Sequence, residues 1–556
     1  MVVGSLIKPR VLTILLLIKK NDFSHGDSEM NTWIIVPLSF VIIIASLATA
    51  DVRLPAIISD NMVIQADVHV PIWGWADPKE TITVTIGSQK QTATAGADGK
   101  WMVKLVAMKP SDTSFEMTVA SKNTIIIKNI LVGQVWLGSG QSNMEMPVNG
   151  VLNASEEINN ARYPLIRLFT VAKAISHKPL TDCNGSWIEC SPQTISSFSA
   201  VAYFFGRELH KELNQPVGLI DSAWGGTIAE AWMSMPAIKA EPDFAPIIQR
   251  YEELIKKYPN GKADYDKALA QWQKDANDAQ KAGKPEPPKA AVPFGEMNPN
   301  GASLLFNGMI ASVIPYGIKG VIWYQGESNT DRSYQYRKLF PTLIADWRAQ
   351  WHQGDFAFLF VQIASFDISP YDMKKDSWAE LRDAQLLTVK KMSNTGMAVI
   401  IDIGEANNIH PKNKQEVGRR LSLWALAKTY GYKGLQYSGP MYQQMNIQGN
   451  KIVLEFDTFC KVKGDELKGF TIAGSDRKFV PAQAKIFKGG VLMPGHPNAH
   501  AEKQMIAVWS PDVNEPVAVR YAWSDNPENC TLSDETGLPA SPFRTDDWPG
   551  VTDGKK

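Results

Sequence analysis

Four runs of apolar residues along the chain each lead into a polar loop that contains glycine. They cover residues 130–137, 217–221, 320–324 and 397–403. Continuous apolar runs of this length are typical of strands buried on both faces of a parallel sheet. After the last run, Val417, Leu421 and Trp424 recur at helical spacing. The pattern predicts an α/β domain whose strands end in polar loops.

Alternation of apolar and polar residues marks the segments on either side of this domain. The clearest strands are predicted at residues 70–76, 82–86, 101–105, 452–456, 484–487 and 517–523. A period of two is typical of half-buried strands between Gly, Pro and Asp turns. We therefore expect a small β-sandwich-like domain over 51–128, an α/β domain over 129–430 and a β-rich region over 431–556.

A polar segment interrupts the α/β domain at about residues 239–293. It is rich in Lys, Glu, Asp, Gln and Ala, and it ends near a Gly- and Pro-rich stretch at 283–288. This composition is typical of solvated helices. We expect a helical insertion folded as a hairpin near the polar loops. An inert surface role is the simpler interpretation, and a role in ligand binding stays open.

The N-terminal residues resemble a targeting signal. Residues 33–47 are apolar, and Ala48-Thr-Ala50 supplies small residues of the kind found at cleavage sites. Met30 would then be the start, although few positive charges precede the apolar run. The alternative is an uncleaved anchor, because residues 31–50 carry no charge and could span a bilayer. We expect residues 1–50 to direct export to the periplasm or the cell exterior, without stable membrane insertion after cleavage.

The overall composition excludes some classes of partner. The 556 residues include 57 Lys and Arg and 57 Asp and Glu, without a basic tract, which argues against nucleic acid. An apolar content of 44% with 17 Trp is typical of a well-packed globular protein. No metal-ligand or phosphate-loop motif is convincing. Cys183 and Cys190 are close enough to close a short loop, which would leave Cys460 and Cys530, but four cysteines allow three connectivities.

The loop after residues 130–137 carries the strongest candidate for chemistry. Gly138 and Gly140 permit a tight turn that leaves Ser142 exposed at the end of a strand, where a helix begins. A nucleophilic serine needs an exposed hydroxyl with free backbone N–H groups nearby for an oxyanion. A helix cap would explain one such serine, but three similar loops accompany it. The motif is not G-x-S-x-G, so the α/β-hydrolase elbow does not fit.

A serine nucleophile needs a base, and the chain contains only 8 His. His410 lies between the apolar run 397–403 and the helical pattern that begins near Val417. Strand-to-helix loops of a parallel sheet are the usual place for such a base. Structural roles are expected for His210, His352, His496 and His500.

Four ordered motifs resemble the sialate O-acetylesterase family of SGNH hydrolases. They are residues 140–144 (Gly-Gln-Ser-Asn-Met), 224–227 (Trp-Gly-Gly-Thr), 323–329 (Trp-Tyr-Gln-Gly-Glu-Ser-Asn) and 408–421, which contains Asn-Ile-His-Pro. The likeness runs from about Leu54 to Asp546 and includes residues 59–65, 72–76 and 537–544. It implies an SGNH-like, flavodoxin-like parallel sheet with helices on both faces, flanked by all-β regions.

The same resemblance implies the roles of the site residues. Ser142 would be the nucleophile and His410 the base. The oxyanion hole would be formed by the Ser142 amide, the Gly225 and Gly226 turn and the Gln325 side chain. Further residues expected to support the site are Asn407, Glu327 and Asn329. No cofactor and no metal are implied.

One position departs from the superfamily pattern. SGNH enzymes generally carry Asp three residues before the histidine, whereas this chain has Asn407. A neutral amide cannot stabilise an imidazolium as a carboxylate does. We favour a Ser–His dyad in which a backbone carbonyl orients His410. Two other interpretations stay open: Asp402 or Glu405 replaces the missing carboxylate, or the protein is a poor catalyst.

The expected function is that of an exported serine esterase. It would remove O-acetyl groups from sialic acids or related glycans through an acetyl-enzyme on Ser142. The alternative within the same class is an acetyl-xylan or other polysaccharide deacetylase. An alternative of another class is a non-catalytic carbohydrate-binding protein, which Asn407 keeps open.

Overall fold

The computed structural model describes most of the chain. The described residues are 12–18, 34–40, 51–288, 295, 297–371, 373–493 and 496–556. They fall into two units, Met1–Asp51 and Val52–Lys556. In the first unit, β1 (Leu12–Ile18) pairs antiparallel with β2 (Ile34–Phe40). The expected cleavage site at 48–50 lies outside the described residues, and among those that are described no helix combines the length and apolarity needed to cross a bilayer.

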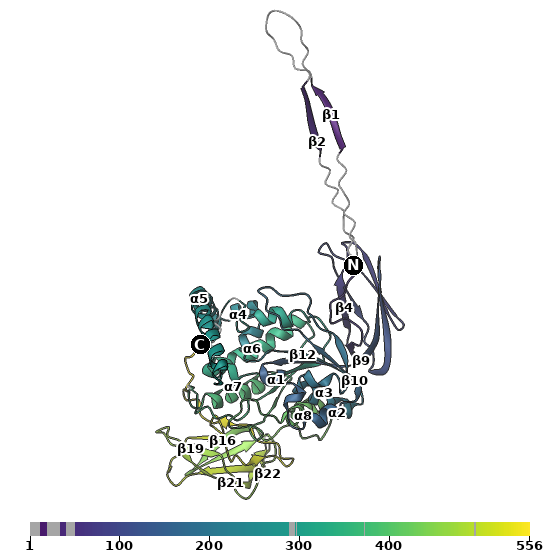
Figure 1. Ribbon diagram of the computed structural model, residues 1–556. Helices are drawn as coiled ribbons and strands as arrows, with labels where there is room; N and C mark the ends of the chain where they lie inside the picture. The colour runs from purple at the N-terminus through teal and green to yellow at the C-terminus, as the bar shows by residue number, and fades with distance from the viewer. Residues whose placement is uncertain are drawn as a thin grey trace, which may run out of the picture. The chain divides into compact units, whose positions relative to one another are not determined.

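A parallel sheet forms the centre of the larger unit (Figure 1). Its strands, in spatial order, are β10 (Tyr163–Thr170), β12 (Val217–Ala223), β9 (Thr124–Gly140), β13 (Gly320–Tyr324), β14 (Ala357–Val361) and β15 (Thr395–Ala398), and the antiparallel β11 (Trp187–Cys190) extends the β10 edge. Every residue of β12, β13 and β14 is buried, as expected of strands covered on both faces. All four predicted apolar runs contribute strands here, although the last strand ends at Ala398 and a turn follows at residues 401–402.

Helices cover both faces of this sheet. On one face lie α3 (Ala200–Leu213) and α8 (Lys414–Trp424), and on the other lie α6 (Ser333–Trp351) and α7 (Ser377–Lys391). Trp136 of β9 packs on Phe205 of α3, with ring centroids 4.9 Å apart. Trp323 of β13 packs on Phe340 of α6 at 6.3 Å. Trp136 and Trp323 therefore point to opposite faces of the sheet. Trp323 pairs with Ser139, which is an odd number of residues from Trp136 on β9, and successive side chains of a strand alternate between the two faces.

The strand order reverses at β9, so the loops after three neighbouring strands meet there. Gly140 at the end of β9 pairs with Ala223 of β12 on one side and Tyr324 of β13 on the other. Open α/β sheets bind ligands at such a switch point. Gly140 has φ +134°, and a Cβ there would lie 2.2 Å from the Tyr324 carbonyl oxygen, so only glycine fits between the two strands.

The N-terminal β region shares a strand with the central sheet. The first part of β9 pairs antiparallel with β8 (Ser111–Ala120), and residues 131–133 pair in parallel with β3 (Val63–Gln65). The remaining strands of this region are β4 (Val70–Trp75), β5 (Thr81–Ile86), β6 (Gln89–Thr94) and β7 (Lys100–Leu105). The boundary expected at 128/129 therefore lies inside one continuous strand.

The C-terminal region is β-rich, which completes the expected α/β class with all-β flanks. One four-stranded sheet contains β16 (Tyr442–Gln448), β17 (Lys451–Phe456), β22 (His496–Trp509) and β21 (Gln483–Met493). A second contains β20 (Val480–Pro481), β19 (Phe470–Ala473), β23 (Ala518–Tyr521) and β25 (Phe543–Arg544), and β18 (Lys461–Val462) pairs with β24 (Leu532–Ser533). All four cysteines are free thiols.

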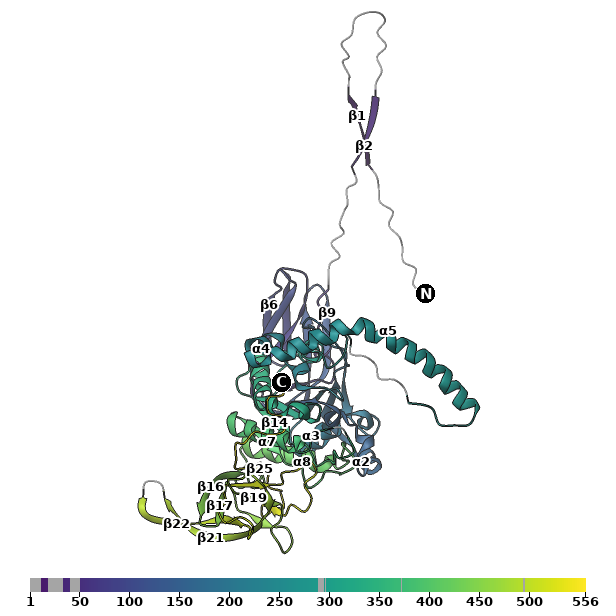
Figure 2. The same ribbon diagram turned by 90° about the vertical axis from the view of Figure 1, so that its left-hand side faces the viewer.

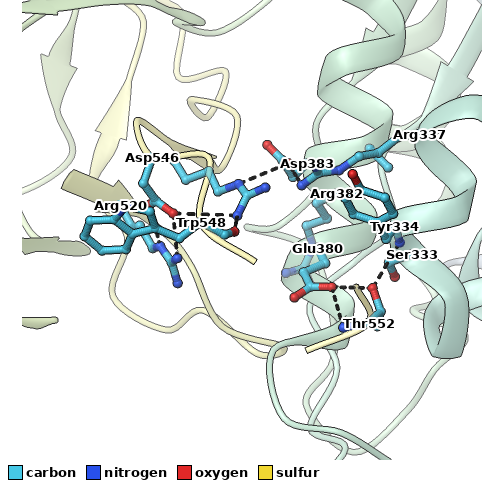
Figure 3. A network of polar contacts seen from close by, with 12 residues as sticks. Ser333, Tyr334, Arg337, Glu380, Arg382, Asp383, Arg520, Asp546, Trp548 and Thr552 are labelled. Atoms are coloured by element: carbon cyan, nitrogen blue, oxygen red, sulfur yellow. Dashed lines mark hydrogen bonds and ion pairs between the residues drawn. The ribbon is translucent and has the colours of Figure 1, made fainter. Parts of the chain in front are cut away.

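The chain then returns from this region to α6 and α7 (Figure 3). Glu380 of α7 accepts hydrogen bonds from the Val551 N–H and from the N–H and hydroxyl of Thr552. The Thr552 hydroxyl oxygen accepts from the N–H of Tyr334 on α6 at 3.0 Å. The last residues of the chain are thus fixed to the helices that cover the sheet.

The insertion is one long helix, α5 (Ala245–Lys281), which projects from the body of the unit (Figure 2). Only Ile247 near its start is buried. The helix ends at Lys281, before Gly283 and the prolines at 285, 287 and 288, so the described part of the expected hairpin contains one helix. The remaining short helices are α1 (Ser142–Glu145), α2 (Ala154–Asn160) and α4 (Met235–Ala240).

Candidate active site

The two residues singled out for catalysis lie together. Ser142 is the first residue of α1, directly after β9, and His410 lies in the loop between β15 and α8. Ser142 Oγ and His410 Nε2 are 2.7 Å apart, so they form a hydrogen bond. Both line a cavity of about 560 Å³. A serine hydroxyl bonded to an imidazole at the wall of a cavity can act as a nucleophile with its base.

The backbone N–H groups of Ser142 and of the turn after β12 are the candidates for an oxyanion hole. A Cβ on Gly225 would lie 3.2 Å from Ser142 Cβ, so the turn after β12 packs against the nucleophile. Gly226 has φ +74° with open space around it. The N–H groups of Ser142 and Gly226 make no hydrogen bond to any other described residue. The Gly225 N–H, in contrast, donates to Glu145 Oε2 at 2.5 Å.

Gln325 makes a different set of contacts from the one expected of an oxyanion donor. Its fully buried side chain donates to the Thr227 carbonyl at 3.1 Å and to Asn329 Oδ1 at 2.6 Å. Its oxygen accepts from the Tyr336 hydroxyl at 2.9 Å. Asn329 in turn accepts from the Ala229 N–H at 2.9 Å. Gln325 and Asn329 therefore join the loop after β13 to the loop after β12.

Behind Ser142, a buried polar cluster joins three loops. Asn143 donates to Glu327 Oε1 at 2.6 Å and to the Ile409 carbonyl at 3.0 Å. Its oxygen accepts from Lys414 Nζ at 2.6 Å. The contact to Ile409 ties the residue after the nucleophile to the residue before the histidine. Asn143 therefore sets the position of one loop relative to the other.

Burial shifts the pKa values of the ionisable residues in this cluster so that their neutral forms are favoured. Burial lowers the pKa of Lys414 to about 7, against the opposing charges of Glu327 and Glu405. Burial raises the pKa of Glu327. The pKa of His410 is lowered, first by burial and then by the positive charge of Lys414. Both effects favour the neutral imidazole, which is the form that accepts a proton.

The backbone around His410 is held from both sides. The His410 N–H donates to Asn408 Oδ1 and the His410 carbonyl accepts from Asn408 Nδ2, each at 3.0 Å. Asn408 Nδ2 also donates to Glu405 at 2.9 Å, and Glu405 accepts from the Lys412 N–H at 2.7 Å. These contacts fix the loop without touching the ring.

The carboxylates considered as replacements for the missing Asp bind elsewhere. Asp402 accepts two hydrogen bonds from Arg420, at 2.6 and 2.8 Å. Glu405 binds Asn408 and Lys412, as described. Asn407 is exposed, and its side chain makes no hydrogen bond to another described residue. Within the described part of the chain, His410 Nδ1 forms no hydrogen bond either.

Sequence reasoning missed several residues of the site. Asn143 and Lys414 lie inside motifs that were recognised, but their mutual contact crosses more than 250 positions of sequence. Glu145, Lys173 and Asp221 line the same cavity as Ser142. Asp221 ends the predicted strand 217–221, and that position beside a Gly-rich loop was the one available signal. No cluster of His, Cys, Asp and Glu suited to a metal occurs among the residues described.

Comparisons with known proteins identify the family to which the chain is similar. The family model for carbohydrate esterase, sialic acid-specific acetylesterase, matches residues 301–425. The sialate O-acetylesterase of Mus musculus is 32% identical over 536 residues, covering 88% of this chain and 94% of its own length. That of Homo sapiens is 30% identical over 551 residues, covering 90% and 94%.

A solved structure extends the likeness to the fold. The crystal structure of a carbohydrate acetylesterase from Xanthomonas citri matches with a TM-score of 0.73 and 33% identity, covering 90% of this chain and 100% of that chain. The match thus includes both β-rich flanks as well as the central sheet. The chain therefore belongs to the sialate O-acetylesterase family, and it is a carboxylic ester hydrolase.

Proposed function

We propose that this protein is an exported serine esterase of SGNH type that removes O-acetyl groups from glycans, with Ser142 as nucleophile and His410 as base. The observation that carries the proposal is the 2.7 Å hydrogen bond between Ser142 Oγ and His410 Nε2 at the wall of a cavity. The family relationship supports deacetylation as the reaction. The apolar run at 33–47 and the small residues at 48–50 support export.

The reaction begins when Ser142 Oγ attacks the acetyl carbonyl carbon while His410 Nε2 takes the hydroxyl proton. The N–H groups of Ser142 and Gly226 donate to the resulting oxyanion. When the intermediate collapses, His410 returns the proton to the sugar oxygen, which leaves as a free hydroxyl. The acetyl group stays on Ser142 as an ester.

Water completes the cycle. His410 removes a proton from a water molecule, whose oxygen attacks the acetyl-enzyme carbonyl, and the second intermediate uses the same N–H donors. Collapse breaks the ester bond to Ser142 Oγ, which recovers its proton from His410, and acetate is released. Gln325 and Asn329 contribute by holding the loops that carry these donors.

Two classes of sugar can carry the acetyl group that the proposed reaction removes, namely sialic acids and neutral polysaccharides. The mammalian relatives are named for sialate, and the acetylated end of the substrate is the same for sialic acid and for a neutral polysaccharide such as xylan. The non-catalytic carbohydrate-binding protein considered from the sequence predicts an unreactive serine, and the membership of this chain in a family of carboxylic ester hydrolases argues against it.

The test is acetate release from 4-nitrophenyl acetate and acetylated xylo-oligosaccharides by the wild type and by Ser142→Ala. We expect at least about a thousandfold loss in the variant, with an unchanged circular dichroism spectrum. His410→Ala should lose at least about a hundredfold. Ser197 lines the same cavity, so Ser197→Ala is the matched control and should retain turnover of 4-nitrophenyl acetate.

A fluorophosphonate probe gives an independent readout of the same serine. Labelling of wild-type protein at Ser142, and none in Ser142→Ala, is expected of an activated nucleophile. Near-wild-type turnover by Ser142→Ala, or a wild-type protein that neither turns over these esters nor reacts with the probe, would show that the proposed mechanism is wrong.

A further inference from the structure

The cavity beside Ser142 contains a buried carboxyl group that the proposed reaction does not use. Asp221 lies on β12, two residues before the end of the strand, and lines the cavity together with Ser142 and His410. It is 7% exposed, and its Oδ1 is buried without a hydrogen-bond partner. Among the described residues, no hydrogen bond to either carboxyl oxygen is formed. A buried carboxyl group without a protein partner, at the wall of a cavity, is suited to receive a ligand.

The surroundings of Asp221 decide its protonation. Burial raises its pKa well above the usual range, and the nearby Glu145 raises it further, against the smaller effect of Lys173. Both effects favour the protonated carboxylic acid over the carboxylate. A carboxylic acid donates one hydrogen bond and accepts others, which matches the hydroxyl groups of a sugar.

The charges lining the cavity are balanced without any ligand. Lys173 and the weakly charged His410 are the basic residues among those lining it. Lys173 forms an ion pair with Glu145, and its ammonium lies 5.2 Å from the ring centroid of Trp224. A ligand carboxylate would therefore compete with Glu145 for the ammonium group of Lys173. Neutral hydroxyl groups would leave this ion pair undisturbed.

We propose that Asp221 binds hydroxyl groups of the sugar that carries the acetyl group, and that the preferred substrate is a neutral O-acetylated glycan rather than an O-acetylated sialic acid. This inference rests on the proposed function. It assigns Asp221 to substrate recognition, while Ser142 and His410 carry out the reaction.

The first test separates recognition from chemistry. Asp221→Ala should lower kcat/KM for acetylated xylo-oligosaccharides at least about tenfold, mainly through KM, because a ground-state contact is lost. Turnover of 4-nitrophenyl acetate, which has no sugar, should change less than about twofold. Asp221→Asn keeps a donor and an acceptor, so it should retain most of the activity on the oligosaccharide.

The Tm of Asp221→Asn separates a recognition role from a structural role. Because the native carboxyl group is buried without a partner among the described residues, Asp221→Asn should leave the Tm unchanged or raise it if Asp221 serves recognition. The exposed Asp98 supplies the matched control, and Asp98→Ala should change the turnover of neither substrate. Equal losses of kcat/KM on the two substrates in Asp221→Ala would overturn the assignment, and a lowered Tm in Asp221→Asn beside such losses would indicate a structural role instead.

The second test compares the substrate classes by acetate release. Wild-type protein should show a higher kcat/KM on acetylated xylo-oligosaccharides than on O-acetylated N-acetylneuraminic acid. Methyl esterification of the sialic acid carboxylate should speed acetate release. Faster release from the free acid than from its methyl ester would overturn the substrate class while leaving the esterase proposal intact. Failure on every ester, 4-nitrophenyl acetate included, would instead overturn the proposed function and this inference with it.

Discussion

At the residue scale, His410 is positioned through its backbone and through the residues next to it. Asn408 binds the N–H and the carbonyl of His410, while Asn143 binds the carbonyl of Ile409. These contacts fix the direction from which the ring leaves the loop, and Ser142 Oγ then meets Nε2. In a triad a carboxylate on Nδ1 has this positioning role. Here neither Asp402 nor Glu405 makes that contact, because each binds a different partner.

The substitution Asn407→Ala tests whether the residue at the missing-Asp position matters. Asn407 is exposed and makes no side-chain hydrogen bond to another described residue, so we expect a loss of less than about tenfold in kcat/KM, or about 1.4 kcal/mol. Asn407→Asp should give little gain. Steady-state acetate release measures both variants. A gain of several hundredfold in Asn407→Asp would show that the native site is an impaired triad.

A second prediction concerns the pH dependence. His410 must be neutral to accept the serine proton, and its pKa is lowered by burial and by Lys414. The acid limb of kcat/KM should therefore lie below the ordinary histidine value of about 6.5. Lys414→Met removes the positive neighbour, so the pKa of His410 should rise and the acid limb should move to higher pH.

The control for this experiment is Lys412, two residues before Lys414. Lys412 is exposed and contacts Glu405 only through its backbone N–H. Lys412→Met should therefore leave the acid limb in place. The charge effect of Lys414 would be refuted if its removal left the limb unmoved or shifted it to lower pH.

At the element scale, α7 connects the catalytic sheet to the C-terminal β region. Arg382 is fully buried and donates to the carbonyls of Ile363 and Ala364 at 2.9 and 2.8 Å. It also donates to those of Ser524 and Asp525 at 2.8 and 2.7 Å. One guanidinium therefore holds the loop after β14 and the loop after β23 to the same helix turn.

Arg382→Met should lower the free energy of unfolding by about 3–5 kcal/mol, because it leaves several buried carbonyls without a donor. Arg419→Met, at an exposed position paired only with Glu416, should cost less than about 1 kcal/mol. Denaturant midpoints followed by tryptophan fluorescence compare the two variants. Equal midpoints would mean that Arg382 does not hold the region in place.

At the scale of the whole molecule, β9 is the element that joins the N-terminal β region to the catalytic sheet. Its first part belongs to the β region and its last residues reach the serine. Because the strand is continuous over Thr124–Gly140, the N-terminal region and the nucleophile share one element.

We predict that mature protein isolated from the native host begins near Asp51, because Ala48-Thr-Ala50 follows the apolar run. N-terminal sequencing or intact-mass measurement of the exported protein checks this. An intact N-terminus recovered in the membrane fraction would favour the anchor.

The linear sequence determined the strands and pointed to the candidate pair Ser142 and His410, and the reason is local. Buried parallel strands need long apolar runs, so β9, β12 and β13 are visible without a structure. Ser142 and His410 are visible because a Gly turn after a strand exposes a side chain, and histidines are few. The insertion also showed its helical character through its composition.

Only the tertiary structure decided what surrounds that pair, because those contacts join loops distant in sequence. Asn143, Glu327 and Lys414 belong to three segments distant in sequence, and the pKa shifts of Glu327 and Lys414 arise from burial that no local pattern reveals. The contacts of Gln325 could not be read from its motif alone, since its amide donates to the Thr227 carbonyl of a distant loop as well as to Asn329. Asp221 likewise reads as the end of a strand until folding buries it beside Ser142 without a partner.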